Sequence, residues 1–253
     1  MCVIAVAETV RITPDQVEKM FEANPAGAGV AWRDEIKDDK GRTHKVVRWK
    51  KGLSLAEVQD ICKDIPLPFV AHFRIPTVGG SKKTLCHPFP IEKEVSLELE
   101  GTTRGFVLFH NGHWGRWKEF SLESAGKNGF KVPTGKWSDS RAMAWAAAHH
   151  GIGVLEFIDE RAIAFSPAEI EVFGGGTTHS AWTLVNGGIF VSNTGWQFRT
   201  QHNNHNNWQG VCMFGHCKLA RINGTKYCAK HPDGKDDILA LPEKKRAWDI
   251  FLG

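Results

Sequence analysis

The sequence predicts an α+β fold with packed layers. Short apolar runs rich in β-branched and aromatic residues, which are typical of strands, follow one another along most of the chain. Only a few segments carry helical periodicity, and they do not alternate regularly with the strands as in a βαβ repeat. The chain has 253 residues, which is enough for one large domain or for one domain with a small appendage.

The first predicted strand is the apolar run CVIAVA at residues 2–7. The other predicted strands share a short length and flanking turn signals. They cover residues 27–32, 45–49, 69–73, 95–99, 106–109, 154–158, 162–165, 182–185 and 189–192. Such runs of strands are typical of packed sheets.

Three segments carry signals for the start of a helix. TPDQ at residues 13–16 combines a capping box with proline at the first helical position, and the helix is expected to end before Pro25. SLAE at residues 54–57 is a second capping box. A third helix is predicted to begin near Ser138, followed by apolar residues along one side.

The composition is ordinary for a soluble globular protein, with 42% hydrophobic and 24% charged residues. A formal net charge of +4 is too small to predict nucleic-acid binding on its own. No apolar run is long enough to cross a bilayer, and residues 1–10 lack the pattern of a signal peptide. We therefore expect a cytoplasmic protein without a membrane anchor.

The chain is predicted to divide near residue 200. The polar, simple segment QHNNHNN at residues 201–207 is typical of a linker. We therefore expect a main domain at residues 1–200, a linker at 201–210 and an appendage at 211–253. Three of the six cysteines lie in that appendage, which favours a metal site over a disulfide framework.

The spacing Cys212-x4-Cys217-x10-Cys228-x2-His231 predicts a structural zinc site. Metal ligation would stabilise a segment with too little apolar sequence to fold unaided. His216 is an alternative ligand, and the other interpretation is three free cysteines and a histidine that meet by chance. Basic residues lie among the ligands, but acidic residues follow at 233–237, so we do not expect nucleic-acid binding.

Cys2 has two interpretations. It is either a small buried residue at the start of a strand or, once Met1 is removed, a nucleophile that also carries the free α-amine. That amine titrates at about 7.7–8.0, so it can take the thiol proton near neutral pH and later return it to a leaving amine. The second interpretation requires no separate histidine base.

Four further segments each have a structural and a functional interpretation. Arg74 and Thr77, in AHFRIPTVG, can bind a carboxylate or lie on a surface turn. Asn111 and Gly112, in FVLFHNG, can form an oxyanion hole or a hairpin turn. Two more candidates are His87 of CHPF, otherwise a packed loop histidine, and Asp139 of WSDSR, otherwise a favourable charge at a helix N-terminus.

In order and approximate spacing, these segments resemble the signature of class II glutamine amidotransferase domains, which are N-terminal-nucleophile hydrolases. The segments NPAGAG at residues 24–29 and WTLVNGGIFVSN at residues 182–193 resemble two further parts of stand-alone members, which also occur in bacteriophages. The resemblance spans about the first 200 residues. Each part has low specificity, whereas the ordered set is specific.

The resemblance implies a four-layer αββα sandwich, in which two antiparallel sheets lie between helical layers. It also implies a role for each matching residue. Cys2 would be the nucleophile, and Asn111 and Gly112 would form the oxyanion hole. Arg74 and Thr77 would bind the α-carboxylate of glutamine and Asp139 its α-amino group, while His87 would lie at the substrate site.

Two departures from the family pattern bear on the substrate. PTV at residues 76–78 and SR at residues 140–141 replace the more usual residues. The predicted function is glutamine hydrolysis through a Cys2 thioester without a cofactor, with the ammonia passed to a partner synthase or ligase on another polypeptide. The alternatives are an N-terminal-nucleophile amidase acting on a different amide and an inactive, zinc-bearing binding module.

Overall fold

The structure is a computed structural model that describes residues 2–75, 80, 82–158, 160–174, 182–185 and 188–197. These residues form two antiparallel sheets and five α-helices, with short 3-10 turns at residues 83–85 and 195–197, so the predicted α+β class is confirmed. The predicted linker at residues 201–210 and the zinc-binding appendage at 211–253 lie outside the described residues. Within the described part of the chain, the longest helices have 12 residues, too short to cross a bilayer.

The larger sheet has seven strands, and the N-terminal strand β1 lies inside it. Because β1 pairs antiparallel with β4 on one side and with β11 on the other, both of its edges are hydrogen-bonded. In spatial order the strands are β10 (Thr183–Val185), β11 (Ile189–Val191), β1 (Val3–Ala7), β4 (Phe69–Phe73), β2 (Ala28–Lys37), β3 (Thr43–Leu53) and β6 (Glu100–Thr103).

The smaller sheet has four strands, with β7 and β8 at its centre. Residues Val107–Asn111 of β7 pair with Arg161–Phe165 of β8, so Asn111 lies opposite Arg161 at one end of the sheet. In spatial order the strands are β5 (Phe89–Pro90), β7 (Val107–Asn111), β8 (Arg161–Phe165) and β9 (Ile170–Phe173).

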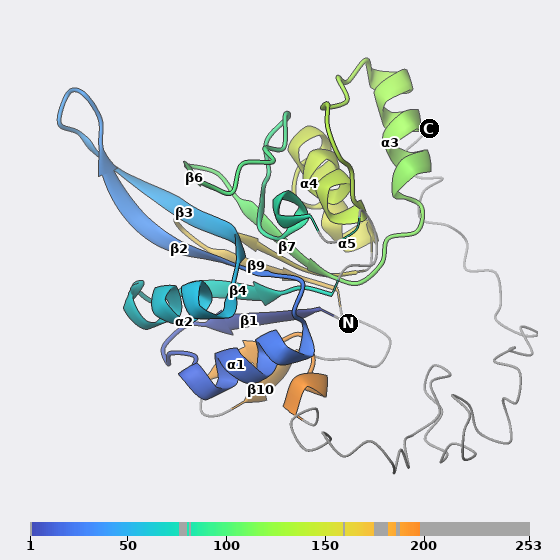
Figure 1. Cartoon of the computed structure of the whole chain (residues 1–253). Helices are drawn as coiled ribbons and strands as arrows, with labels where there is room; N and C mark the ends of the chain where they lie inside the picture. Colours follow the sequence, from blue (N-terminus) through green and yellow to red (C-terminus); the bar gives the residue numbers. More distant parts are fainter. Residues whose placement is uncertain are drawn as a thin grey trace, which may run out of the picture. The chain divides into compact units, whose positions relative to one another are not determined.

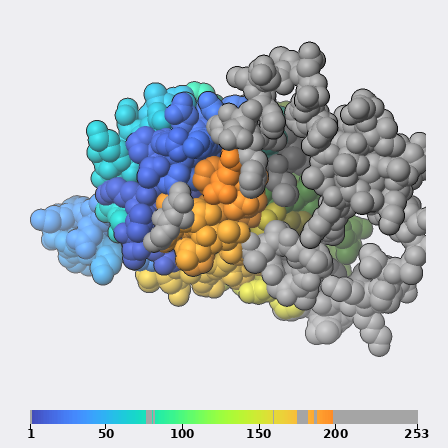
Figure 2. Space-filling view, turned by 90° about the horizontal axis from the view of Figure 1, so that it is seen from below, coloured from blue at the N-terminus to red at the C-terminus, as the bar shows by residue number. Residues whose placement is uncertain are grey.

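Helices α1 (Pro14–Ala23) and α2 (Leu55–Asp64) cover one face of the larger sheet (Figure 1). Both begin where the capping boxes predict, with Thr13 and Ser54 as the N-caps. The inward-facing residues of both helices and of β1, β2, β4 and β11 form one apolar core. Figure 2 shows this side of the molecule, where α1 in blue lies beside the β10–β11 region in orange.

The opposite face of the larger sheet packs against the smaller sheet. Alternation along β1 divides its side chains, because Val3 and Ala5 face the helices whereas Ile4 and Val6 face the second sheet. There they join Phe109 of β7 in a second core. Helix α4 (Asp139–His150) packs on β7 and β5, with α3 (Trp117–Asn128) and α5 (Val154–Ile158) beside it (Figure 1).

Two strand predictions are wrong. Residues 154–158 form helix α5, because Leu155 and Ile158 are buried at helical spacing while Phe157 between them is exposed. Residues 95–99 are not a strand, since Val95 takes a left-handed φ of 38° and its carbonyl accepts a hydrogen bond from Arg141; β6 begins only at Glu100.

Helix α3 was not predicted. Its sequence lacks a one-sided apolar pattern, because Leu122 is 72% exposed whereas Ser121 and Ser124 are buried. These serines bond within the helix layer, Ser121 to the Trp117 carbonyl and Ser124 to the His150 ring. Polar packing of this kind leaves no periodic hydrophobic signal in the sequence.

Candidate active site

A pocket opens to solvent where β1 begins, β4 and β7 end and α4 begins. Of the seven residues predicted for catalysis or substrate binding, five line it. They are Cys2, Arg74, His87, Gly112 and Asp139. Asn111 adjoins the pocket through Gly112, and Thr77 lies outside the described residues.

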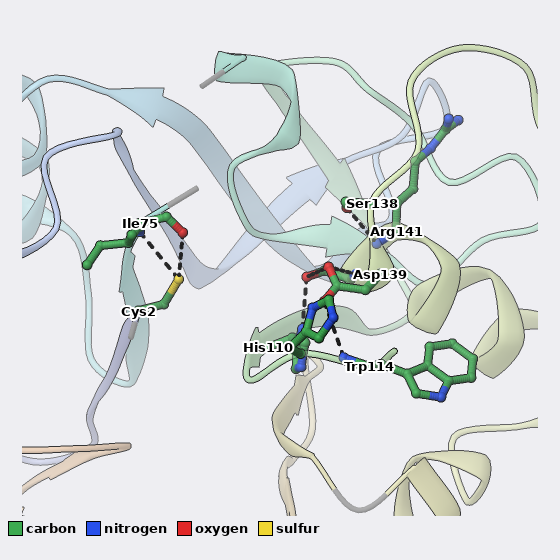
Figure 3. A network of polar contacts seen from close by, with 9 residues as sticks. Cys2, Ile75, His110, Trp114, Ser138, Asp139 and Arg141 are labelled. Atoms are coloured by element: carbon green, nitrogen blue, oxygen red, sulfur yellow. Dashed lines mark hydrogen bonds and ion pairs between the residues drawn. The ribbon is translucent and has the colours of Figure 1, made fainter. Parts of the chain in front are cut away.

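Cys2 directly precedes β1, and its thiol lies against the chain that leaves β4. The Cys2 thiol donates to the Ile75 carbonyl and accepts from the Ile75 N–H, both at 3.4 Å (Figure 3). Burial raises the pKa of the thiol, and the Ile75 N–H acts in the opposite direction. A thiol in this position needs an adjacent base to become a nucleophile near neutral pH.

The residues that follow β11 hold the main chain of β1. The Asn193 side-chain amide donates to the Cys2 carbonyl at 2.6 Å, and the Ser192 hydroxyl accepts from the Ile4 N–H at 2.9 Å. Both bonds span nearly the whole described chain, from its first residues to its last. They fix the backbone that carries the thiol.

Arg74 extends from the end of β4 into the pocket. Its backbone extends the β4–β2 pairing by one residue, since the Arg74 N–H donates to the carbonyl of Gly27, which directly precedes β2, at 3.0 Å. Its guanidinium Nη2 donates to the Gly80 carbonyl at 2.7 Å, and the side chain is buried. A buried guanidinium lining a polar pocket is suited to bind a carboxylate.

Asn111 and Gly112 lie at the end of β7. The Asn111 Nδ2 atom donates to the Ser192 hydroxyl at 2.7 Å, whereas its buried Oδ1 has no hydrogen-bond partner among the described residues. A Cβ atom at position 112 would lie 1.8 Å from Oε2 of Glu160, so a larger residue there would have to displace that carboxyl group. Burial raises the pKa of the Glu160 carboxyl, and the His113 N–H acts against that increase.

Asp139 occupies the first turn of α4, after the N-cap Ser138. Its Oδ1 accepts from the Ser140 N–H at 2.9 Å, and its Oδ2 accepts from the Trp114 N–H at 3.3 Å (Figure 3). The His113 ring approaches Oδ2 to 3.5 Å from the exposed side. The carboxylate is therefore held at the pocket wall, where it can bind an ammonium group.

Three buried histidines line or adjoin the pocket. The ring of His72 lies 4.0 Å from that of His87, which lies 6.3 Å from that of His110. Burial lowers the pKa of His72 to about 3 and that of His110 to about 4, and it holds the pKa of His87 well below its usual value. The three rings are therefore neutral at pH 7 and can donate or accept hydrogen bonds without adding charge.

Ser140, His110, Ser192, Asn193 and Glu160 were not assigned roles from the sequence, although the structure places them in or around the pocket. His110 Nδ1 lies 2.9 Å from the Ser140 hydroxyl, and both residues line the pocket. The sequence signal for the first two was their position beside predicted site residues. Ser192 and Asn193 end the segment 182–193 that resembles the family, although no role was derived for them, and no local signal marks Glu160.

The described residues contain no group of three histidine, cysteine or acidic side chains that could hold a metal ion. Cys2, Cys62 and Cys86 are all free thiols. The predicted zinc ligands Cys212, Cys217, Cys228 and His231 lie outside the described part of the chain.

The pocket can thus offer a thiol, a cation, an anion and neutral hydrogen-bonding groups to one small ligand. Neither the protein-family models nor the curated proteins include a match to this chain.

Proposed function

We propose that this protein is a glutamine-hydrolysing enzyme of the class II glutamine amidotransferase type. The observation that carries the proposal is one pocket lined by Cys2, Arg74, Gly112 and Asp139, which come from separate elements. A layer order of helices, sheet, sheet and helices supports assignment to the αββα sandwich of N-terminal-nucleophile hydrolases.

The proposed substrate is bound through both of its charged ends. Arg74 holds the α-carboxylate of glutamine, assisted by Thr77, and Asp139 holds the α-ammonium group. His87 lines the same pocket and stays neutral, because burial holds its pKa well below the usual value. This arrangement positions the side-chain amide near Cys2, since the charged clamp removes most of the freedom of the bound molecule.

The reaction then proceeds in two steps in a chain from which Met1 has been removed. The α-amine of Cys2 takes the thiol proton, and Sγ attacks the amide carbon. The resulting oxyanion faces the Asn111 side-chain amide and the Gly112 N–H, each such donor contributing about 2.7–4 kcal/mol in the transition state. Cleavage of the C–N bond, with the proton returned to nitrogen, releases ammonia and leaves a γ-glutamyl thioester.

Water completes the cycle. The α-amine takes a proton from the water, which attacks the thioester carbon, and cleavage of the C–S bond regenerates the thiol and releases glutamate. We propose that the ammonia is used by a synthase or ligase on another polypeptide in the cytoplasm. We also propose that the appendage at residues 211–253 binds a structural zinc ion. The proposed function involves neither a membrane nor nucleic acid.

Substrate recognition provides the test. Asp139→Asn should raise the KM for glutamine by roughly 10- to 100-fold, because hydrogen bonds to charged groups contribute about 1.5–3 kcal/mol. The measurement compares glutamine with 5-amino-5-oxopentanoate, which is glutamine without its α-amino group. The wild type should strongly prefer glutamine, and Asp139→Asn should lose that preference.

Asp34→Asn is the matched control, because Asp34 pairs with Arg48 on the hairpin β2–β3 and does not line the pocket. It should leave the KM unchanged. Equal preference of the wild type for both compounds would contradict the role of Asp139. Turnover of acylated amines or small peptides in place of glutamine would favour the amidase alternative, and complete inactivity of a chain that retains Met1 would favour a binding module.

A further inference from the structure

We infer that Ser192 is a positioning residue whose hydroxyl determines which atom of the Asn111 amide faces the oxyanion. This inference rests on the proposed function, in which Asn111 stabilises the oxyanion. It adds a residue that touches neither the substrate nor the nucleophile. The geometry around three groups carries it: the Ile4 N–H, the Ser192 hydroxyl and the Asn111 side chain.

Ser192 directly follows β11 and is completely buried. Its N–H donates to the Ile4 carbonyl at 2.9 Å, and its hydroxyl accepts from the Ile4 N–H at 2.9 Å. Its own carbonyl accepts a hydrogen bond from Nη1 of Arg161. The main chain at Ser192 is therefore fixed independently of the hydroxyl.

The hydroxyl also contacts the Asn111 amide, with Nδ2 at 2.7 Å. In this orientation Oδ1 of Asn111 is buried and has no hydrogen-bond partner among the described residues. A serine hydroxyl offers one hydrogen and two acceptor positions. Here both neighbours donate to it, so its hydrogen is not used by either of them.

A half-turn of the Asn111 amide exchanges the positions of its oxygen and nitrogen. The unpartnered Oδ1 then lies beside the unused hydrogen of the Ser192 hydroxyl. The Ser192 hydroxyl then accepts from Ile4 and donates to Oδ1, which satisfies the buried oxygen. Both hydrogens of Nδ2 are released from Ser192 and become available to an oxyanion. In the catalytic state, Ser192 therefore binds the acceptor end of the amide and leaves the donor end for the substrate.

The same segment also fixes the nucleophile, because the Asn193 amide donates to the Cys2 carbonyl at 2.6 Å. Ser192 and Asn193 thus connect β1, which carries the thiol, to β7, which carries the oxyanion donor. The distance between nucleophile and donor is set by this connection. Catalysis by a preorganised donor depends on such positioning, since the donor must not reorganise during the reaction.

The test is a double-mutant cycle between Ser192→Ala and Asn111→Ala, measured as kcat and KM for glutamine. Ser192→Ala should lower kcat roughly 10- to 100-fold, less than the roughly 10²–10³-fold loss expected on removing a donor outright. The KM should stay within about twofold, because Arg74 and Asp139 are unchanged. The double variant should be no slower than Asn111→Ala, since Ser192 acts through Asn111.

Two controls separate this role from a general loss of structure. Ser166→Ala removes another buried hydroxyl, which accepts from the N–H groups of Ala168 at 3.2 Å and Glu169 at 3.0 Å, and it should leave kcat unchanged. Alkylation of Cys2 by iodoacetamide needs no oxyanion hole and should proceed at the wild-type rate in Ser192→Ala.

A second measurement uses the unaltered protein. In a crystal structure of the adduct with the γ-aldehyde of glutamate, one Asn111 amide atom should contact the new oxygen while the other contacts the Ser192 hydroxyl. An Asn111 amide turned away from Ser192 would overturn the inference, as would an unchanged kcat or additive losses in the cycle. A wild type that hydrolyses no amide would instead overturn the proposed function, and this inference with it.

Discussion

Two buried regions of the molecule differ in chemistry: the core between the larger sheet and helices α1 and α2, and the region around the pocket. The core beneath α1 and α2 is built from apolar side chains, including Val3, Met20 and Phe69. The pocket region buries His87, His110 and Asn111, each with at least one side-chain atom that has no hydrogen-bond partner among the described residues. Burying such atoms costs about 1–3 kcal/mol each.

This difference assigns separate tasks to the two regions. The apolar core stabilises the fold, because burial of apolar surface is the main favourable contribution to folding. The pocket region destabilises it, which is tolerable only where the polar groups have a function. Substitutions in the apolar core should therefore lower stability and leave activity unchanged. Substitutions of polar residues in the pocket region should raise stability and impair activity.

The largest expected change in stability comes from the apolar core. Phe69→Ala should lower the free energy of unfolding by about 3–5 kcal/mol, because Phe69 is completely buried between β1 and β2. Its kcat per folded molecule should remain that of the wild type, since Phe69 lies at the opposite end of β4 from Arg74. Denaturant unfolding and active-site titration measure the two quantities.

Phe157→Ala is the control for this substitution, because Phe157 is 42% exposed. It should cost clearly less than Phe69→Ala. A Phe69→Ala variant that keeps its stability, or that loses kcat while folded, would remove the distinction between the two regions.

Lys51 tests the cost of a buried charge at the border of the pocket region. Its ammonium group lies 4.4 Å from the Phe89 ring centroid and 3.4 Å from the Ser96 carbonyl oxygen, and burial lowers its pKa from 10.5 to about 7. Between these pH values the unfolded chain binds more protons than the folded one, so wild-type stability should increase with pH.

Lys51→Met should therefore be more stable than the wild type at pH 6, by roughly 1–3 kcal/mol. The difference should shrink as the pH approaches 10.5, where the unfolded lysine also loses its charge. Urea denaturation at pH 6 and pH 9.5 measures it. A stability difference independent of pH would show that the lysine is not held in a neutral form by burial.

His87 gives the smallest expected change in stability. In contrast to Phe69→Ala, its substitution should raise stability and weaken substrate binding. Neither ring nitrogen has a hydrogen-bond partner among the described residues, so His87→Leu should raise stability by about 1 kcal/mol at pH 7. The gain should grow as the pH falls below 6.5, because the unfolded histidine gains a proton that the folded one does not. The KM for glutamine should rise, since His87 lines the pocket.

Thermal unfolding at pH 5 and pH 7, combined with the glutaminase assay, measures both effects. His110→Leu is a poor comparison because that ring contacts Ser140 at 2.9 Å. His149→Leu is a better one, since burial also lowers the pKa of His149 and its Nε2 has no hydrogen-bond partner among the described residues, but it does not line the pocket. If His87→Leu loses stability and retains activity, the ring is structural.

Local signals predicted much of the fold. The capping boxes at Thr13 and Ser54 mark the starts of α1 and α2, and Ser138 caps α4. These signals involve residues three or four positions apart, which a sequence shows directly. The strand predicted at residues 154–158 failed because five apolar-rich residues fit either a strand or a helical turn.

Long-range contacts could not be predicted in the same way. The hydrogen bond from Ile4 to Ser192 joins residues 188 positions apart, and that from Asn111 to Ser192 joins residues 81 apart. The sequence indicated Cys2 and Asn111 through their resemblance to a family signature. It placed Ser192 in a segment that resembles the same family, but it did not indicate that this serine connects their strands. The position of the Glu160 carboxyl group, which lies where a Cβ atom of residue 112 would be, was not predicted for the same reason.

The central claim is that the Cys2 thiol, with its own α-amine, is the nucleophile of this pocket. The most direct test is the reaction of the protein with 6-diazo-5-oxo-L-norleucine, a glutamine analogue that alkylates a nucleophile at the amide position, followed by intact mass and peptide mapping. We predict a chain without Met1 that carries one label on Cys2, and no label on Cys2→Ala. A chain that retains Met1, or a label on Cys62 or Cys86 in place of Cys2, would contradict the account.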